Sequence, residues 1–535
     1  MSALDVLRQL KLARRAKGPK KIIEWGNADY INEIGAENLS ARDLRNHLEA
    51  RDLDTVGTRL ELIERLRVSL ADEQLHKFAY KETLDTEFLI QADLEERGSV
   101  YVAGKNDKGQ LGIGDTENRQ FFCVIPQMRG ANVYDNAVGD DLTYAFTEDH
   151  IIYVWGGAGV GRTGYNPNAP KSMQGGQDNW LEPTIVYDLQ GEDITQVSVG
   201  ASHCVASAKG GDCFVWGDGG VGQLGLGHFE DHPTIGINNS FSAIKQVEAG
   251  QNHTVALTET GRMYAWGHAC NGRLGVGSSE RIGVPENERQ YFPVPTLITN
   301  MENIKTISCG ADHTLAIGDS GVWAWGCNSG GKLGLGDQKD RYDPIMVPRL
   351  KHKIVLQISA ATYHSMALVQ YPPMKGGGAI YTWGSGYHGQ LAQDKTQVSM
   401  LPQPVNYFFD LHILIKHISA GAFHCAAITR EGELYTWGSN AHGNLARVID
   451  ERDVQYTPTP GHVGGFGAIV DRIGRGFPRS VRCGRDYTIV CTWPYEGPNF
   501  DVCSKLMEEK KIREEEALLQ DMQAGGQGAL QDDDD

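Results

Sequence analysis

One histidine recurs in this chain at a fixed place in a short motif, Gly-x-x-His, and histidine is the side chain best suited to bind a metal or to transfer protons near neutral pH. Consecutive copies lie 50 to 60 residues apart. The motif, with alanine replacing the glycine in one copy, ends at His203, His253, His313, His364 and His424. Because each repeat contributes a single histidine, the five cannot converge on one ion. We therefore expect buried histidines hydrogen-bonded to backbone rather than a metal site.

A second set of residues could hold a phosphate. Residues 156–163 fit G-x-x-x-x-G-K-[ST] with arginine in place of lysine, and Gly159, Gly161 and Gly164 fit G-x-G-x-x-G. Both motifs bind nucleotides where a strand leads through the loop into a helix. Residues 156–164 are instead in register with residues 217–225 of the next repeat. We expect a turn there, and no nucleotide or other cofactor.

The elements that carry these motifs form a repeat with two halves. In the first half a short aromatic strand ends in glycine, six times out of seven after a tryptophan, and a Gly-x-Leu-Gly-like turn follows. The strand-ending glycines are Gly104, Gly156, Gly217, Gly267, Gly326, Gly384 and Gly438. The second half is the Gly-x-x-His motif, with degenerate copies at residues 139–142 and 484–487 that bring its number to seven. A period of 50 to 61 residues indicates one supersecondary unit copied in series.

The strands within each repeat are short and bounded by glycine, as in residues 263–266 and 433–437. About four strands per unit, repeated seven times, predict a mainly β protein, a seven-bladed β-propeller over residues 98–494. A last strand near residues 487–490 should complete a blade with a first strand near residues 100–103. Segments longer than the repeat template are predicted recognition loops. They are residues 165–183, 278–295, 371–378 and 448–478.

This order of motifs over residues 98–493 resembles the RCC1 family of seven-bladed propellers. The resemblance implies a platform for protein partners. The best-known activity of the family is guanine-nucleotide exchange on the small GTPase Ran, for which an acidic residue directly before a repeat histidine is important. The matching residue here is Asp312, the candidate catalytic residue, although a turn-forming aspartate is the alternative. Asn252 stands where another repeat of that exchange factor has a second histidine. The light-sensing branch relies on a Gly-Trp-Arg-His-Thr string that this chain lacks.

Residues 38–71 read as two helices with S/T-x-x-D/E starts at Ser40 and Thr58. The segment resembles the SAP motif, a two-helix unit common in DNA and chromatin proteins, and the resemblance implies phosphate binding at Arg59 and the adjacent helix N-terminus. Asp52, where the family usually has glycine, and Asp54 oppose an anion. A helical hairpin that docks on protein is the alternative.

The first 21 residues carry a net charge of +6, and the rest of the chain carries −24, for a total of −18. Such a basic arm suits phosphate contact or nuclear import. Its candidate phosphate ligands are Lys11, Arg14, Arg15, Lys17, Lys20 and Lys21. A solvated tail and a mitochondrial presequence are the alternatives, and Asp5 together with the scarcity of serine argues against the second.

The expected organisation is a basic arm and linker (1–37), a SAP-like helical domain (38–71), a connector (72–97), the propeller (98–494) and a helical, acidic tail (495–535). The predicted function is a nuclear protein that binds DNA or chromatin through residues 1–71 and protein partners through its loops, with or without exchange activity. The alternative is a cytoplasmic or cytoskeletal scaffold without enzyme activity. No apolar run reaches 18 residues, so no membrane span is expected.

Overall fold

The computed structural model describes Leu48, Ile63, Leu66 and residues 98–493, the latter without residues 165–178, 241–242, 279, 300, 302, 371–377, 394–396, 448, 450–454, 465 and 467–476. The three isolated residues belong to the SAP-like segment and are helical and buried. The rest of that segment, the basic arm and the acidic tail lie outside the described residues.

The strands of the described residues form seven antiparallel groups of four, here called blades, and one residue pair, Gly378 with Ile415, links two of these groups in a continuous sheet. Blade 1 contains β3 (Val133–Val138), β4 (Leu142–Thr147), β5 (Ile152–Gly157) and β6 (Asn179–Ile185). Blade 2 contains β7 (Ile194–Val199), β8 (His203–Ala208), β9 (Cys213–Gly217) and β10 (His232–Ile237). Blade 3 contains β11 (Ile244–Ala249), β12 (His253–Thr258), β13 (Met263–His268) and β14 (Tyr291–Leu297).

The second half of the chain repeats this order. Blade 4 contains β15 (Thr306–Cys309), β16 (His313–Gly318), β17 (Gly321–Gly326) and β18 (Arg341–Met346). Blade 5 contains β19 (Val355–Ala360), β20 (His364–Gln370), β21 (Gly378–Ser385) and β22 (Val398–Pro404). Blade 6 contains β23 (Ile415–Ala420), β24 (His424–Thr429), β25 (Leu434–Ser439) and β26 (Tyr456–Val463).

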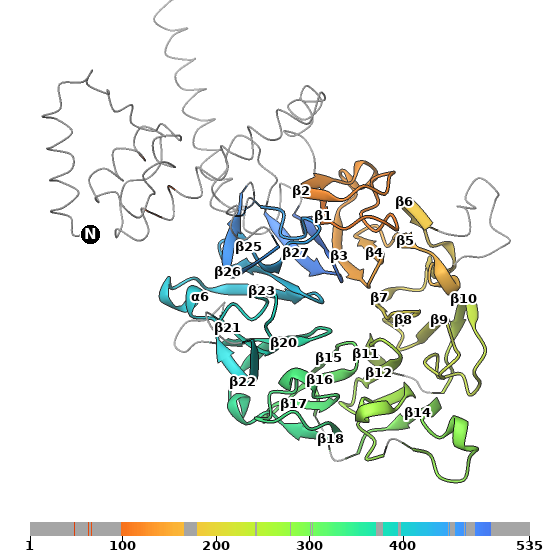
Figure 1. Cartoon of the computed structure of the whole chain (residues 1–535). Helices are drawn as coiled ribbons and strands as arrows, with labels where there is room; N and C mark the ends of the chain where they lie inside the picture. The colour runs from red at the N-terminus through yellow and green to blue at the C-terminus, as the bar shows by residue number, and fades with distance from the viewer. Residues whose placement is uncertain are drawn as a thin grey trace, which may run out of the picture.

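The closing blade joins the two ends of the propeller. It contains β27 (Pro478–Cys483), β28 (Tyr487–Thr492), β1 (Val100–Gly104) and β2 (Arg119–Val124). Val100 pairs with Cys491, and Gly104 pairs with Tyr487, so the first strand lies beside the last one. In Figure 1 the orange first strands and the blue last strands meet accordingly, and the blades run round a ring. The predicted seven-bladed ring and its closure are confirmed.

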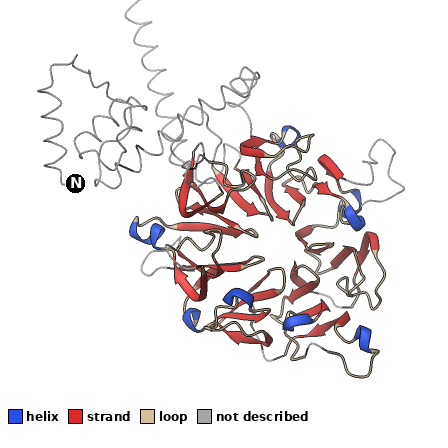
Figure 2. Cartoon of the chain, viewed as in Figure 1, coloured by secondary structure: helices blue, strands red, loops and turns tan. Residues whose placement is uncertain are grey.

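Helical structure is minor in the described part of the chain, as the few blue turns in Figure 2 show. The turns are η2 (Pro126–Met128), η3 (Gly159–Gly161), η5 (Tyr187–Leu189), η6 (Cys270–Gly272), η7 (Glu286–Glu288), η8 (Ser329–Gly331), η9 (Pro348–Leu350) and α6 (Asn406–Asp410). None of these helices has the length and hydropathy that a membrane crossing requires.

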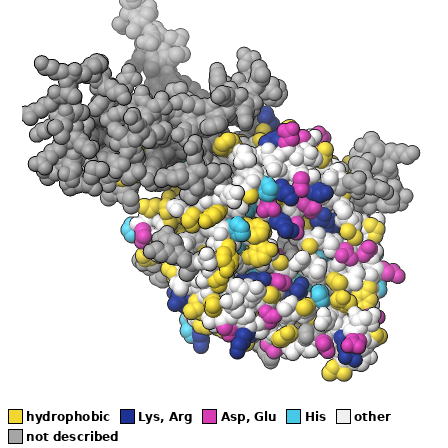
Figure 3. Space-filling view, in the orientation of Figure 1, with side chains coloured by type: hydrophobic (Ala, Val, Ile, Leu, Met, Phe, Trp, Pro, Cys, Tyr) yellow, Lys and Arg dark blue, Asp and Glu magenta, His cyan; other side chains and the backbone are white. Residues whose placement is uncertain are grey.

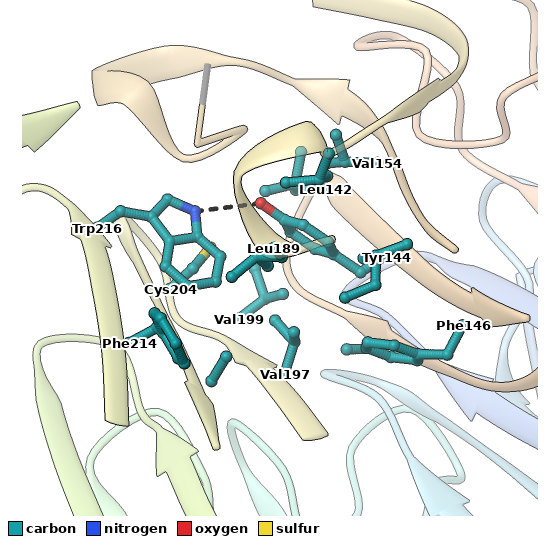
Figure 4. Packing of buried hydrophobic residues seen from close by; sticks show 14 of the residues in the cluster. Leu142, Tyr144, Phe146, Val154, Leu189, Val197, Val199, Cys204, Phe214 and Trp216 are labelled. Atoms are coloured by element: carbon teal, nitrogen blue, oxygen red, sulfur yellow. Dashed lines mark hydrogen bonds between the residues drawn. The ribbon is translucent and has the colours of Figure 1, made fainter. Parts of the chain in front are cut away.

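Blades pack against each other through the tryptophan on the third strand of each numbered blade. All six side chains are fully buried: Trp155, Trp216, Trp266, Trp325, Trp383 and Trp437. Figure 4 shows one junction, where Trp216 of blade 2 points toward Tyr144 of blade 1 and donates a hydrogen bond of 3.1 Å to its phenol oxygen. The tryptophan side chain at the junction therefore combines burial of apolar surface with a hydrogen bond from its indole N–H.

The two recurrent glycines of the first half-motif have separate steric reasons. Gly225 has φ +70°, and a Cβ there would lie 2.7 Å from the indole nitrogen of Trp266. The turn packs directly on the tryptophan of the next blade, so a side chain at this position would clash with the indole. Gly267, directly after that tryptophan, has φ +102°, and a Cβ would lie 2.6 Å from the carbonyl oxygen of Asn252. Only glycine adopts both conformations without strain.

The predicted loops need one correction, because they contain strands. Outer strand β6 occupies the end of 165–183, β14 the end of 278–295, and β26 lies inside 448–478. The prediction followed from segment length alone, and the extra residues of each segment lie beside its outer strand. These strands are edges, where a missing N–H faces outward and proline blocks pairing with another chain.

Candidate functional site: the mouth of the central channel

The inner strands of the seven blades end around one opening, the mouth of the central channel. The opening holds a cavity of about 240 Å³ that is lined by residues from every blade. We call the side of the ring on which these strands end the mouth face. The motif glycine or its counterpart lines the opening in each blade: Gly139, Gly200, Gly250, Gly310, Ala361, Gly421 and Gly484. A Cβ on Gly310 would lie 2.3 Å from the carbonyl oxygen of Ala361 in the next blade, so the glycines permit close approach of the blades.

The inner strands have an edge that, apart from the single pair of Gly378 with Ile415, no other strand covers, and in several blades side chains of the preceding blade accept hydrogen bonds from the amides of this edge. In four blades a serine two residues before the motif glycine accepts a backbone N–H of the next blade at 2.9–3.1 Å. The four are Ser198, Ser308, Ser359 and Ser419. Two blades have a charge at this position. Glu248 accepts hydrogen bonds from Gln196 and Gln246, and Arg482 forms an ion pair with Asp135. Burial raises the pKa of Glu248.

The repeat histidines join one blade to the next. His203 Nε2 lies 2.8 Å from Thr254 Oγ1, which donates to the carbonyl of Gln223 at 2.8 Å. Trp266 Nε1 donates to that same carbonyl at 2.8 Å. The equivalent histidine contacts, at 2.8–3.3 Å, are His253 to Thr314, His313 to Ser365, His364 to Cys425 and His424 to Thr488.

The expected backbone partner of these histidines was therefore wrong. Backbone groups of the second strand of each blade are used in ladders with the strands on both sides, so the ring finds a hydroxyl or thiol across the interface instead. Complete burial lowers the pKa of His203 to about 4 and the pKa values of His364 and His424 to about 3. These side chains stay neutral at neutral pH. No group of three or more metal-ligating side chains occurs among the described residues.

Two positions on the mouth face vary strongly between repeats. The pre-histidine position directly precedes the last residue of the Gly-x-x-His motif; its occupants are Asp141, Ser202, Asn252, Asp312, Tyr363, Phe423 and Asp486. The turn position is the second residue of the Gly-x-Leu-Gly-like turn; its occupants are Gln110, Arg162, Gln223, Arg273, Lys332, Gln390 and Asn444. Both follow strand ends on the same face, so their side chains can meet within one blade.

Asp312, the candidate catalytic residue, forms an ion pair with Lys332, the turn residue of its own blade. The side chain of Asp312 is 24% exposed and that of Lys332 is 5% exposed. Lys332 also donates to the carbonyl of Thr362 in the next blade at 3.3 Å. Asp312 thus holds a cation that bridges two blades, a role that single-residue matching to a family motif did not reveal. Aligning the repeats would have shown an acid and a cation at the two positions.

Blade 1 contains the same arrangement. Arg162 Nη1 lies 2.7 Å from Asp141 Oδ1 and donates to the carbonyl of Ala201 in blade 2 at 3.0 Å. Arg162 is the residue that stood for lysine in the phosphate-loop-like string, and the strand before that string leads into a turn rather than an α-helix. The predicted turn is confirmed.

An aromatic cluster on the mouth face had no sequence prediction. Tyr363 of blade 5 stacks on Phe423 of blade 6 with ring centroids 4.9 Å apart, and His388 packs edge-on against Phe423 at 4.8 Å. Tyr363 is 41% exposed, and Tyr387, which directly precedes His388 in the chain, is 57% exposed. Exposed aromatic groups of this kind are enriched in protein interfaces. The candidate phosphate ligands Lys11, Arg14, Arg15, Lys17, Lys20, Lys21 and Arg59 lie outside the described residues.

Seven four-stranded blades closed by their first and last strands define a β-propeller whose ring supports a variable mouth face. Residues 87–367 match the profile of the RCC1-like domain, and residues 377–428 and 415–444 match that of the Regulator of chromosome condensation (RCC1) repeat. The chain belongs to the RCC1-like family.

Relatives support this assignment. The chain is 31% identical over 344 residues to the Ultraviolet-B receptor UVR8 of Arabidopsis thaliana, covering 64% of this chain and 73% of that protein. It is 31% identical over 373 residues to the RCC1 domain-containing protein RUG3, mitochondrial, of the same plant, covering 69% of this chain and 68% of that protein. Prp20p from Saccharomyces cerevisiae superposes with a TM-score of 0.61 over 80% of this chain and 98% of its own; at 19% identity this likeness shows the fold alone.

Proposed function

We propose that this protein is a nuclear, chromatin-associated propeller that holds DNA with its basic arm and SAP-like segment and binds a protein partner on its mouth face. The observation that carries the protein-binding part is the exposed aromatic cluster around Tyr363 and Phe423, which lies where the loops of neighbouring blades converge. Prp20p, which shares the fold, was described together with its binding properties to Gsp1p and histones. This description supports a proposal in which the present protein also binds both a protein partner and chromatin.

The DNA-binding part of the proposal is assigned to the arm because of the charge distribution. The first 21 residues carry +6 and the rest of the chain −24. In Figure 3 positive and negative side chains are mixed on the visible face of the propeller, and hydrophobic side chains gather left of its centre. That face gives no continuous basic surface for a phosphate backbone, whereas the arm concentrates cations in a short stretch.

The full chain is expected to bind duplex DNA with little sequence preference and with affinity that falls steeply with salt. Engaging about 4–6 phosphates gives a log–log slope of about −0.9 per phosphate. Removing residues 2–21 should flatten that slope more than Arg59→Ala does, because the arm carries most of the charge, and should release a tagged copy from the nucleus. Fluorescence anisotropy at several salt concentrations measures the first effect and microscopy the second.

One variant and one outcome separate this proposal from a docking hairpin. Converting Asp52 and Asp54 to Lys should tighten binding, since both carboxylates oppose a phosphate. If the full chain does not bind DNA even at low salt, the chromatin proposal fails and the scaffold alternative remains, with the SAP-like segment bound to protein.

Guanine-nucleotide exchange on a Ran-type GTPase is the second candidate, favoured by the place of Asp312 on the mouth face. We expect the protein to accelerate release of a labelled guanine nucleotide, and Asp312→Asn to reduce that rate about tenfold or more. Asp141→Asn breaks the matched ion pair in blade 1 and serves as the control for a merely structural loss. Equal losses in both variants, or no acceleration by the wild-type protein, would remove Asp312 from a direct role.

A further inference from the structure

The turn position is occupied by a cation in three blades, and in two of them a carboxylate of the same blade forms an ion pair with it. Arg162, Arg273 and Lys332 are 6%, 7% and 4% exposed. Arg162 is paired with Asp141 and Lys332 with Asp312, in both cases the pre-histidine residue of the same blade. Blade 3 has Asn252 at that position. Its buried arginine therefore lacks the carboxylate that the other two cations have.

The backbone around Arg273 has the same arrangement as that around Arg162. Arg273 Nε donates to the carbonyl of Cys270 at 2.9 Å, as Arg162 Nε does to that of Gly159 at 3.2 Å. The terminal nitrogens differ. In the described part of the chain neither Nη of Arg273 has a hydrogen-bond acceptor, and both reach solvent. The carbonyl of Ala311, equivalent to the one that Arg162 contacts in blade 2, instead accepts the N–H of Gln251 at 2.9 Å.

The groups beside Arg273 are also suited to an anion. The Asn252 side chain makes no hydrogen bond to the described residues, so its amide N–H groups are available. Among the described residues no carboxylate forms an ion pair with Arg273. The titratable groups that Arg273 influences are His253 and His268, and its charge adds to the effect of burial in lowering their pKa values. An arginine fork with a neighbouring amide is the arrangement that binds a carboxylate with two parallel hydrogen bonds.

We propose that Arg273 and Asn252 form a carboxylate-binding site on the mouth face that receives an acidic side chain of a protein partner. The partner supplies in trans the group that Asp141 and Asp312 supply within their own blades. A peptide segment fits better than a small free acid because Gln251 beside the site is exposed on an open face. The aromatic cluster of blades 5 and 6 on the same face offers that partner apolar contact. This site rests on the proposed binding of a protein partner, and it depends neither on DNA binding nor on nucleotide exchange.

The test uses two substitutions that make blade 3 resemble other blades, so the fold already accommodates both. Arg273→Gln introduces the residue found at the turn position of blades 2 and 5, Gln223 and Gln390. Asn252→Asp introduces the residue found in blades 1 and 4, which should capture the guanidinium internally. Lys245→Gln removes an exposed charge from the same blade away from the mouth and is the charge-matched control.

A fluorescent hexaglutamate peptide is titrated into the full chain at low salt, with hexaglutamine as the neutral probe. The wild-type protein and Lys245→Gln should bind hexaglutamate more tightly than hexaglutamine. Arg273→Gln and Asn252→Asp should each weaken hexaglutamate binding about tenfold or more, as expected for the loss of a charge-assisted hydrogen bond. Asn252→Asp should also raise the melting temperature, because it pairs a buried cation.

Two results would overturn the proposal: equal binding of both peptides by the wild-type protein, or unchanged hexaglutamate binding by Asn252→Asp. Either result is distinct from failure of the DNA-binding proposal, which is measured with a different ligand on residues 1–71. If Arg273→Gln or Asn252→Asp fails to fold, its melting curve shows this, and the peptide affinity of the other variant then tests the proposal.

Discussion

A chain that begins at Lys105 is expected to lose cooperative folding, whereas one that begins at Gly98 is expected to keep it. The shorter chain lacks β1, which pairs with β28 on one side and β2 on the other. Val100 and Val102 are fully buried in the core shared with blade 1, and Ala103 is buried against blade 6. Losing this apolar burial and two ladders costs roughly 5–10 kcal/mol, comparable with the whole stability of a domain.

Circular dichroism during thermal unfolding and size-exclusion chromatography measure this difference. The chain that begins at Gly98 is the matched control, since it removes the arm, the SAP-like segment and the connector but no described strand. Equal melting temperatures for the two chains would show that the ring does not depend on closure by β1.

Trp266→Ala is expected to destabilise the propeller by about 3–5 kcal/mol, because it removes a fully buried indole and leaves a cavity between blades 2 and 3. The indole N–H also donates to the carbonyl of Gln223, where Thr254 and His203 complete the junction. Trp266→Phe, which keeps a ring but no N–H donor, should cost less and separates the packing effect from the hydrogen bond.

Trp323→Ala provides the control for this experiment. Trp323 lies on β17 and is only partly buried, so its removal exposes less apolar surface to water and creates no closed cavity. Urea unfolding at equilibrium gives the free energies. A midpoint unchanged by Trp266→Ala, or lowered equally by both alanine substitutions, would show that the Trp-Gly motif does not form the blade junctions.

The fold was predictable because its signals repeat. Each tryptophan and each motif glycine solves one steric problem at one blade junction, and seven copies of that solution appear in the sequence at a regular period. Pairing of β1 with β28 followed from the two half-motifs left at the ends of the series. The repeats therefore gave the topology without any information on contacts.

The errors arose where a residue's partner lies in another blade. The histidines were expected to contact backbone, yet their ring nitrogens meet Thr254 and its counterparts across an interface that local sequence does not describe. The outer strands β6, β14 and β26 were included in predicted loops because those segments are longer than the repeat template, and length alone does not show where a strand pairs. In both cases the local structure depends on where the residues lie in the folded ring, which a single repeat does not reveal.

The mouth face was the least predictable region. Asp312 was singled out by comparison with a family, and the structure adds Lys332 as its partner. The aromatic cluster escaped notice because Tyr363 and Phe423 are 60 residues apart in sequence and carry no motif of their own. Arg273 differs from the other two cations because the pre-histidine residue of its own blade, Asn252, is not an acid.

The closure of the ring also determines how the protein responds to force. The chain enters β1 at Val100, opposite Cys491, and leaves β28 at Thr492, whose N–H bonds to the carbonyl of Ser99 at 2.9 Å. Both flanking segments therefore leave from the same end of one antiparallel pair. Tension between them would open that pair one hydrogen bond at a time, as a zipper opens, rather than shear all its bonds together. A molecule pulled from both ends would yield first at its seam, at low load, while the six remaining blades were still intact.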